Sequence, residues 1–270
     1  MKPLTDIPQF LRSKYKIEDI NINELNYDFI HNYEIWLKTV RNCDHNTTMK
    51  YLANFKKIVL RCVKSGKLLR DPFSGFKLSK KEVEKTPLTE MQLRKITQIQ
   101  TLVSRLDIVK DIFIFCCYTG LAYADVKTLK HSEIFESADG ERWIISKRQK
   151  TRTTFKIPLL IPAIEILNKY KDYHQSRCRE YVLPVLSNQK MNSYLKEIAD
   201  KAEIHANLTF HIARHTFATT VALSNGVPIE TVAKMLGHVN LKTTQHYAKI
   251  LDKKIGDDMK KLKDYRFDKI

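Results

Sequence analysis

The chain has 270 residues, 43% of them hydrophobic, so it is long enough for one large domain or two modest ones with a real core. Its 7 glycines and 8 prolines are few, which favours helices joined by short connections. No apolar run approaches the roughly 20 residues of a membrane-spanning helix, and residues 1–10 have no signal-peptide core. We therefore expect a cytoplasmic protein with no membrane partner.

The formal net charge of +17 predicts a polyanionic partner, most often nucleic acid. Basic residues are in excess both in residues 1–83 and in the rest of the chain, which predicts two DNA-facing surfaces rather than one basic tail. The alternative is a basic surface that only keeps the protein soluble.

The 5 cysteines are odd in number and have no metal-ligand spacing. Cys116 and Cys117 are adjacent in an apolar segment, so we expect reduced core residues of a cytosolic protein and no bound metal. The others are Cys43, Cys62 and Cys178.

Two helices are predicted in the first part of the chain. Residues 23–37 carry apolar side chains at helical spacing, and Asn46 is placed to cap a second helix from Thr47 to Lys64. Basic residues of the second helix share the face away from its apolar stripe. They are Lys50, Lys57, Arg61 and Lys64. Like charges on one face repel unless a polyanion meets them, so we expect DNA-backbone contacts; a solvated surface is the alternative.

A domain boundary is predicted near residue 84. Leu78–Thr86 is charged without an apolar period, which is typical of a linker. Thr89 is followed three residues later by Gln92, a capping box that opens a helix. The expected domains are therefore 1–83 and 84–270.

The second part is predicted to begin with a buried helix, Ile108–Tyr118, that turns at Thr119-Gly120. A second helix (Ala122–Leu129), two β-rich segments (Arg142–Ser146 and Thr154–Ile157) with a basic tip between them, and a helix at Ala163–Tyr170 follow. We predict a mainly α fold with a small antiparallel β-hairpin.

The last quarter of the chain holds the most informative polar residues. Leu208–Leu223 is an amphipathic segment in which His211 and Arg214 are three residues apart, so both are expected to project into the same space. A short helix then ends at Gly237, His238 follows, and Asn240 can cap the helix that carries Tyr247.

These residues carry a resemblance. His211-Ile212-Ala213-Arg214, then Leu236-Gly237-His238, then Tyr247 nine residues later, resembles the tyrosine recombinase (phage integrase) family. Thr119-Gly120-Leu121 and the basic hairpin fall where that family has them. The local amino-acid sequence is also similar to that of integrases of conjugative transposons. The resemblance implies a two-domain C-clamp, with a helical, SAM-like core-binding domain over 1–83 and a mixed α/β catalytic domain over 84–270.

The family's chemistry suits these side chains. A phenol attacks a phosphodiester poorly unless cationic donors favour the phenolate, and a planar guanidinium can clamp two phosphate oxygens. The resemblance implies that Tyr247 is the nucleophile, that Arg214 clamps the phosphate, that His211 is a proton acceptor or donor near Tyr247, and that His238 donates to the phosphate. No metal or nucleotide cofactor is expected.

The hairpin is expected to supply the remaining residues. The family places a lysine there as general acid; Lys150 has the best spacing and Lys147 is the second choice. The family also has an arginine where this chain has Ala122, a loss worth roughly 10²–10³ in rate. In an extended strand Arg148 would point to the same side as Lys150, so Arg148 is the expected substitute and Arg152 the alternative.

Some residues receive lesser expectations. His205 and His215 are predicted to be structural, and Asp125 to orient the site. Lys147 and Arg152 are also expected to contact DNA. The tail from Leu251 to Ile270 either docks on a neighbouring protomer or is a charged terminus.

The leading prediction is a site-specific recombinase that integrates or excises a mobile element. It would act on double-stranded DNA as a tetramer on two duplexes, associated with the nucleoid, with an accessory DNA-bending protein as a candidate partner. The alternatives are a DNA-binding relic without catalysis and a type IB topoisomerase. A minimal recombinase and a truncated gene both fit the absence of an arm-binding domain.

Overall fold

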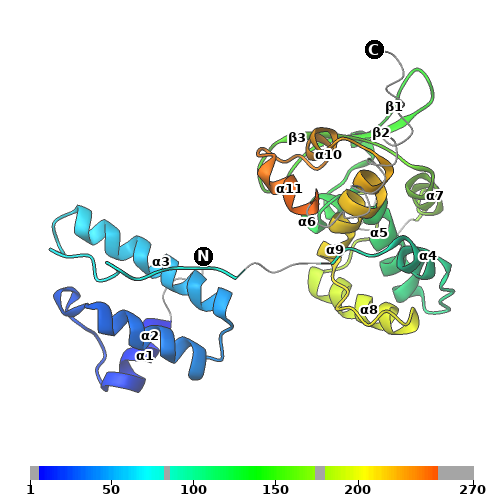
Figure 1. Ribbon diagram of the computed structural model, residues 1–270. Helices are drawn as coiled ribbons and strands as arrows, with labels where there is room; N and C mark the ends of the chain where they lie inside the picture. Colours follow the sequence, from blue (N-terminus) through cyan, green and yellow to red (C-terminus); the bar gives the residue numbers. More distant parts are fainter. Residues whose placement is uncertain (1–5, 82–85, 174–179, 249–270) are drawn as a thin grey trace, which may run out of the picture. The chain divides into compact units, whose positions relative to one another are not determined.

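The structure is a computed structural model that describes residues 6–81, 86–173 and 180–248. The chain divides into two compact units, Met1–Glu84 and Lys85–Ile270, each with its own hydrophobic core. Helices dominate both, and the described part contains one three-stranded antiparallel sheet (Figure 1). The predicted fold class is confirmed. Among the described residues, none of the helices combines the length and apolar character that a bilayer span requires.

The first unit packs its helices around buried aromatic rings. Its elements are α1 (Asp6–Phe10), η1 (Leu11–Tyr15), η2 (Ile22–Glu24), α2 (Tyr27–Thr39) and α3 (His45–Lys64). The Phe10 ring contacts the rings of Phe29 and Tyr33, with centroids 5.3 and 5.1 Å away. The helix predicted from residue 23 starts later, because Asn26 accepts a hydrogen bond from the backbone N–H of Phe29 and caps α2.

The start of α3 differs from the prediction. Asp44, rather than Asn46, caps the helix by accepting the backbone N–H of Thr47 at 2.7 Å. The Asn46 amide instead pairs with both backbone groups of Lys81, each at 2.8 Å. The predicted linker is thus held to the start of α3 at Ser79 and Lys81.

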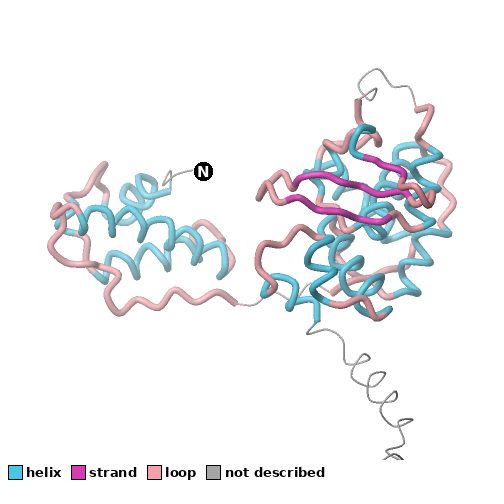
Figure 2. The backbone as a smooth tube through the Cα atoms, turned by 90° about the horizontal axis from the view of Figure 1, so that it is seen from above, coloured by secondary structure: helices cyan, strands magenta, loops and turns pink. Residues whose placement is uncertain are grey.

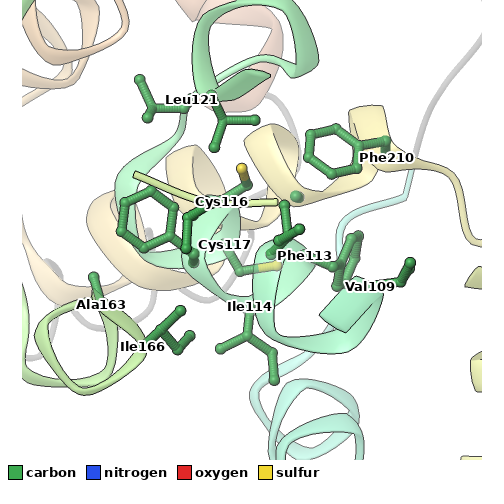
Figure 3. Packing of buried hydrophobic residues seen from close by; sticks show 14 of the residues in the cluster. Val109, Phe113, Ile114, Cys116, Cys117, Leu121, Ala163, Ile166 and Phe210 are labelled. Carbon is green, nitrogen blue, oxygen red and sulfur yellow. The ribbon is translucent and has the colours of Figure 1, made fainter. Parts of the chain in front are cut away.

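The second unit is built around α5 (Ser104–Thr119), which is buried nearly all round, as predicted. Around it pack α4 (Glu90–Gln98), α7 (Ile161–Lys169), α8 (Asn188–Lys201) and α9 (Phe210–Thr216). Figure 3 shows Ala163 and Ile166 of α7 at the lower left of the buried α5 side chains and Phe210 of α9 at their upper right. Cys116 and Cys117 are fully buried free thiols in this core. The capping box of α4 is present, whereas α8 was not predicted.

The sheet lies against this helical core. Its strands are β1 (Ile134–Glu136), β2 (Arg142–Lys147) and β3 (Thr154–Pro158), in the order β1-β2-β3 (Figure 2). Ile144 of β2 pairs with Ile134 on one side and Ile157 on the other, and Ile144 and Ile157 are buried. The edge strand β1, after η3 (His131–Glu133), was not predicted because it is only three residues long.

The segment predicted as one helix from Leu208 to Leu223 is divided. α9 passes into a π-helix, η4 (Phe217–Ala222), and then a 3-10 turn, η5 (Leu223–Asn225). Two hydroxyls one turn apart hold the backbone of Leu88: Thr216 accepts its N–H at 3.0 Å and Thr220 donates to its carbonyl at 2.5 Å. After the predicted stop at Gly226 come α10 (Ile229–Met235) and α11 (Lys242–Ala248). The short helix α6 (Tyr123–Lys127) follows the turn at Gly120.

Replacing Gly120 with alanine should destabilise the second unit. Gly120 has φ of 69°, and an added Cβ would lie closer than 3.0 Å to atoms of Phe217 and Leu236. We expect Gly120→Ala to lower the free energy of unfolding by about 2–4 kcal/mol in urea denaturation. Gly140→Ala is the matched control, because Gly140 has φ of 81° but nothing within 4 Å of the added Cβ. Equal losses in the two variants would contradict the close packing at Gly120.

Candidate active site

Arg214 lies at the centre of the site and joins three segments of the second unit. It is only 4% exposed. Its Nη1 donates to the Gly120 carbonyl at 2.7 Å, and its Nη2 donates to the Leu236 carbonyl at 2.5 Å. Nη2 also lies 3.0 Å from Nε2 of His238. The guanidinium therefore ties α9 to the turn after α5 and to the turn after α10.

Burial changes the acidity of this guanidinium. Burial first, and then the positive charge of Arg148, lower the pKa of Arg214 to about 10. A hydrogen bond with Tyr247 and the charge of Asp125 act in the opposite direction. Arg214 is still a cation at neutral pH, so the site contains a fixed positive charge shielded from water.

The protonation of His238 follows from its two partners. A guanidinium can only donate, so Nε2 of His238 accepts from Arg214 and Nδ1 donates to Oγ1 of Thr244 at 2.8 Å. Burial, followed by the charges of Arg214 and Arg148, lowers the pKa of His238 to about 4. The imidazole is thus neutral at neutral pH. For the predicted donation to a phosphate, it must gain a proton or exchange its tautomer.

Tyr247 points inward from α11. Its side chain is 5% exposed and belongs to a small apolar cluster with Phe217 and Leu236. Two imidazoles border its ring. The His215 ring meets it edge to face, with centroids 4.9 Å apart and planes at 76°, and the His238 ring lies nearly parallel to it at 6.2 Å and 9°.

The two histidines of α9 lie beside each other. Arg214 is buried, whereas His211 on the same helix is exposed. The His211 ring contacts that of His215, at 4.7 Å and 78°. His215 was predicted to be structural only, yet it is the ring that reaches Tyr247. Its position four residues after His211 predicts the contact between those two rings but not the contact with Tyr247.

The hairpin brings Arg148 into the site by a route that differs from the predicted one. β2 ends at Lys147, residues 149–151 form a turn, and Arg152 has a left-handed φ of 60°. Strand alternation therefore does not relate Arg148 to Lys150. Arg148 is nevertheless largely buried, while Lys147, Lys150 and Arg152 are exposed.

Asp125 and Gly237 fix the position of Arg148. Asp125 accepts the backbone N–H of Gln149 at 2.9 Å, and its Oδ2 lies 3.1 Å from Nη1 of Arg148 as an ion pair. An added Cβ at Gly237 would lie 2.7 Å from Cγ of Arg148, so this glycine leaves room for the arginine. Two guanidiniums thus belong to one site, although Ala122, at the N-terminus of α6, supplies none.

The remaining predicted residues lie elsewhere. All four basic residues assigned to DNA contact in the first unit are exposed on α3; they are Lys50, Lys57, Arg61 and Lys64. Over residues 6–81, 86–173 and 180–248, no group of three or more His, Cys, Asp or Glu side chains is arranged to hold a metal ion. Two guanidiniums and the neutral imidazole of His238 beside a phenol form a site suited to an anionic ester.

The geometry agrees with comparisons to known proteins. Residues 87–254 match the phage integrase family, and residues 4–83 match the phage integrase SAM-like domain. The chain belongs to the phage integrase family. This family member is 32% identical to the tyrosine recombinase XerA of Thermococcus onnurineus over 173 residues, which is 60% of this chain and 57% of the relative.

A tyrosine recombinase of Thermosipho africanus is 31% identical over 152 residues, 54% of this chain and 50% of the relative. The integrase chain described here thus spans about half the length of these curated relatives. Among solved structures, a lambda integrase dimer bound to a core site has a TM-score of 0.69 at 16% identity, covering 88% of this chain and 85% of that one. The Tn1549 transposon integrase with circular intermediate DNA has the same TM-score and identity, covering 94% and 91%. At such identities the likeness shows the fold alone.

Removing the carboxylate of Asp125 should destabilise the second unit. The side chains of Arg148 and Asp125 are only 13% and 3% exposed, so Asp125→Ala leaves a buried guanidinium without its counter-charge. We expect a loss of about 3 kcal/mol in the free energy of unfolding. Urea denaturation followed by Trp143 fluorescence in a Trp36→Phe background measures it.

The control for this variant is Glu136→Ala. Glu136 forms a longer ion pair with Arg142, 3.8 Å, in which the side chains are 65% and 37% exposed. Its loss should cost less than about 1 kcal/mol. A Glu136→Ala effect as large as that of Asp125→Ala would show that the buried pair does not hold the hairpin.

Proposed function

We propose that this chain is a site-specific DNA recombinase that cleaves and rejoins DNA through a 3′-phosphotyrosyl intermediate and so integrates or excises a mobile element. The proposal rests on three side chains that meet in one buried cluster. They are Arg214 of α9, His238 of the turn after α10, and Tyr247 of α11. Family membership supports it, as do relatives that are named recombinases and a fold shared with a transposon integrase bound to DNA.

In the proposed reaction the phenol oxygen of Tyr247 attacks the scissile phosphorus. The bond to the 5′ oxygen breaks, Lys150 gives that oxygen a proton, and the phenol proton passes to His211. A partner strand's 5′-hydroxyl reverses the step. The ester keeps the bond energy, so no nucleotide is consumed. Because Arg214 is buried, its charge acts on the phosphate with little screening by water.

Arg148 is the proposed substitute for the arginine that Ala122 lacks. Its Nε is buried and makes no hydrogen bond to any described residue, and its charge lowers the pKa of both Arg214 and His238. An unpaired buried donor and two adjacent guanidiniums are unfavourable by themselves, and an anionic phosphate would relieve both. This supports a phosphate-binding role for Arg148.

The proposed partner is double-stranded DNA. The exposed basic face of α3 would contact the backbone from the core-binding unit (1–83), and Lys147 and Arg152 would do so from the catalytic unit (84–270). A tetramer on two duplexes, an accessory DNA-bending protein and a place in the cytoplasm at the nucleoid complete the proposal. The tail from Leu251 to Ile270 lies outside the described residues.

A nicked suicide substrate made from the DNA that flanks the gene tests the proposed function. The parent protein should form a covalent adduct that survives SDS, and Tyr247→Phe should form none, because it lacks the attacking oxygen. No adduct with the parent would indicate a DNA-binding relic instead, as the alanine at position 122 would allow. Relaxed plasmid without recombinant product would indicate a topoisomerase.

Truncation of Arg148 should slow adduct formation on the same substrate. We expect Arg148→Ala to lower the cleavage rate roughly 10²–10³-fold, because one phosphate donor is lost. Arg142→Ala is the matched control: this arginine lies at the other end of β2, where it donates to Asn168 at 3.0 Å. A parent-like cleavage rate in Arg148→Ala would contradict the phosphate-binding role of Arg148. A loss of cleavage in Arg152→Ala alone would give that role to Arg152.

A further inference from the structure

We propose that His215 is a positioning residue for Tyr247: its imidazole packs edge to face on the phenol and holds the oxygen in line for attack. The inference rests on the proposed function, in which Tyr247 is the nucleophile. It assigns a role to a third histidine, in addition to His211 and His238.

His215 itself is held firmly. It lies on α9 next to Arg214, whose hydrogen bonds to Gly120 and Leu236 anchor the helix. Its ring is half-buried, between the exposed ring of His211 at 4.7 Å and the buried ring of Tyr247 at 4.9 Å. The three rings form a row from the surface of α9 to the interior. His215 is thus a fixed surface against which the ring of Tyr247 packs.

Tertiary contacts surround the phenol ring of Tyr247. The ring is buried in a cluster with Phe217 and Leu236, and two imidazoles lie beside it. His238 lies parallel to the ring at 6.2 Å, a distance too long for close stacking, whereas His215 meets it at 4.9 Å. The edge-to-face contact is the closer of the two imidazole contacts.

Loss of this contact should affect the reaction more than the fold. A phenol without His215 can rotate into the space that the imidazole leaves, and a displacement of about 1 Å at a reacting atom can cost roughly 10²-fold in rate. The main core around α5 does not include His215, so we expect it to be unchanged by the loss. DNA binding by the basic face of α3 is also unaffected.

The test compares three substitutions at this position, His215→Ala, His215→Phe and His215→Gln, with His205→Ala as the matched control. His205 is an exposed histidine of the same unit. Each full-length variant is assayed for its adduct-forming rate on the suicide substrate, its DNA affinity and its melting temperature. We expect the rate of His215→Ala to fall about 10- to 100-fold with DNA affinity unchanged. His215→Phe, which keeps a ring, should recover most of the rate.

A second readout does not depend on catalysis. In protein labelled with ¹³C at its tyrosine rings, the Tyr247 resonance is the one that Tyr247→Phe removes. It should shift in His215→Ala and return towards the parent position in His215→Phe. If the parent forms no adduct, the proposed function fails, and this resonance still decides whether His215 positions the ring.

Three results would overturn the inference. One is parent-like cleavage by His215→Ala; another is a Tyr247 resonance that does not move. The third is recovery in His215→Gln but not in His215→Phe, which would mean that the imidazole acts through a hydrogen bond and not through ring packing.

Discussion

The second unit depends on the burial of one guanidinium. A cation removed from water is stable only if its donors are satisfied, and Arg214 finds acceptors in two backbone carbonyls and one imidazole. Those acceptors come from the turns at Gly120 and Leu236 and from His238. The requirement to satisfy Arg214 therefore fixes both turns, and through the second turn it fixes the place where α11 begins. Tyr247, the proposed nucleophile, lies on α11, so its position depends on the charge of Arg214, which the fold must accommodate in any case.

A second constraint is the excess of positive charge around that cation. Arg148 and Arg214 lower the pKa of His238, and Arg148 lowers that of Arg214, while Asp125 is the acidic side chain that opposes them. Both effects disfavour the protonated forms, so His238 is neutral at neutral pH beside two guanidiniums that keep their charge. A bound anion would act in the opposite direction and favour the protonated imidazole.

Much of this could be predicted from the sequence, because local patterns set it. The buried helix α5, the capping box of α4 and the turn glycines each follow from a few neighbouring residues. What failed depended on distant partners. Asn46 has the chemistry of a cap, but Lys81 competes for its amide and Asp44 replaces it. The break of the helix after Thr216 involves Leu88, more than a hundred residues earlier in the chain.

The site shows the same division. Tyr247, Arg214 and His238 were identifiable by their resemblance to a family motif, and the structure brings them together. The role of His215 was not visible, because nothing in its own neighbourhood shows that α11 returns to cover it. Arg148 was predicted from the alternation of side chains along an extended strand, but β2 ends before it at Lys147. Its position depends instead on the carboxylate of Asp125 and on the absence of a side chain at Gly237.

The backbone of Leu88 is fastened at both its polar groups to Thr216 and Thr220, two and six residues beyond Arg214. The polypeptide that enters the second unit is therefore attached to the same stretch of chain that carries the buried cation. In mechanical terms, a pull on the chain upstream of Leu88 would load two attachments at once. One is the pair of hydrogen bonds to the junction of α9 and η4, where the helix is already widened into a π turn, and the other is the packing of the buried Leu88 side chain in the core around α5.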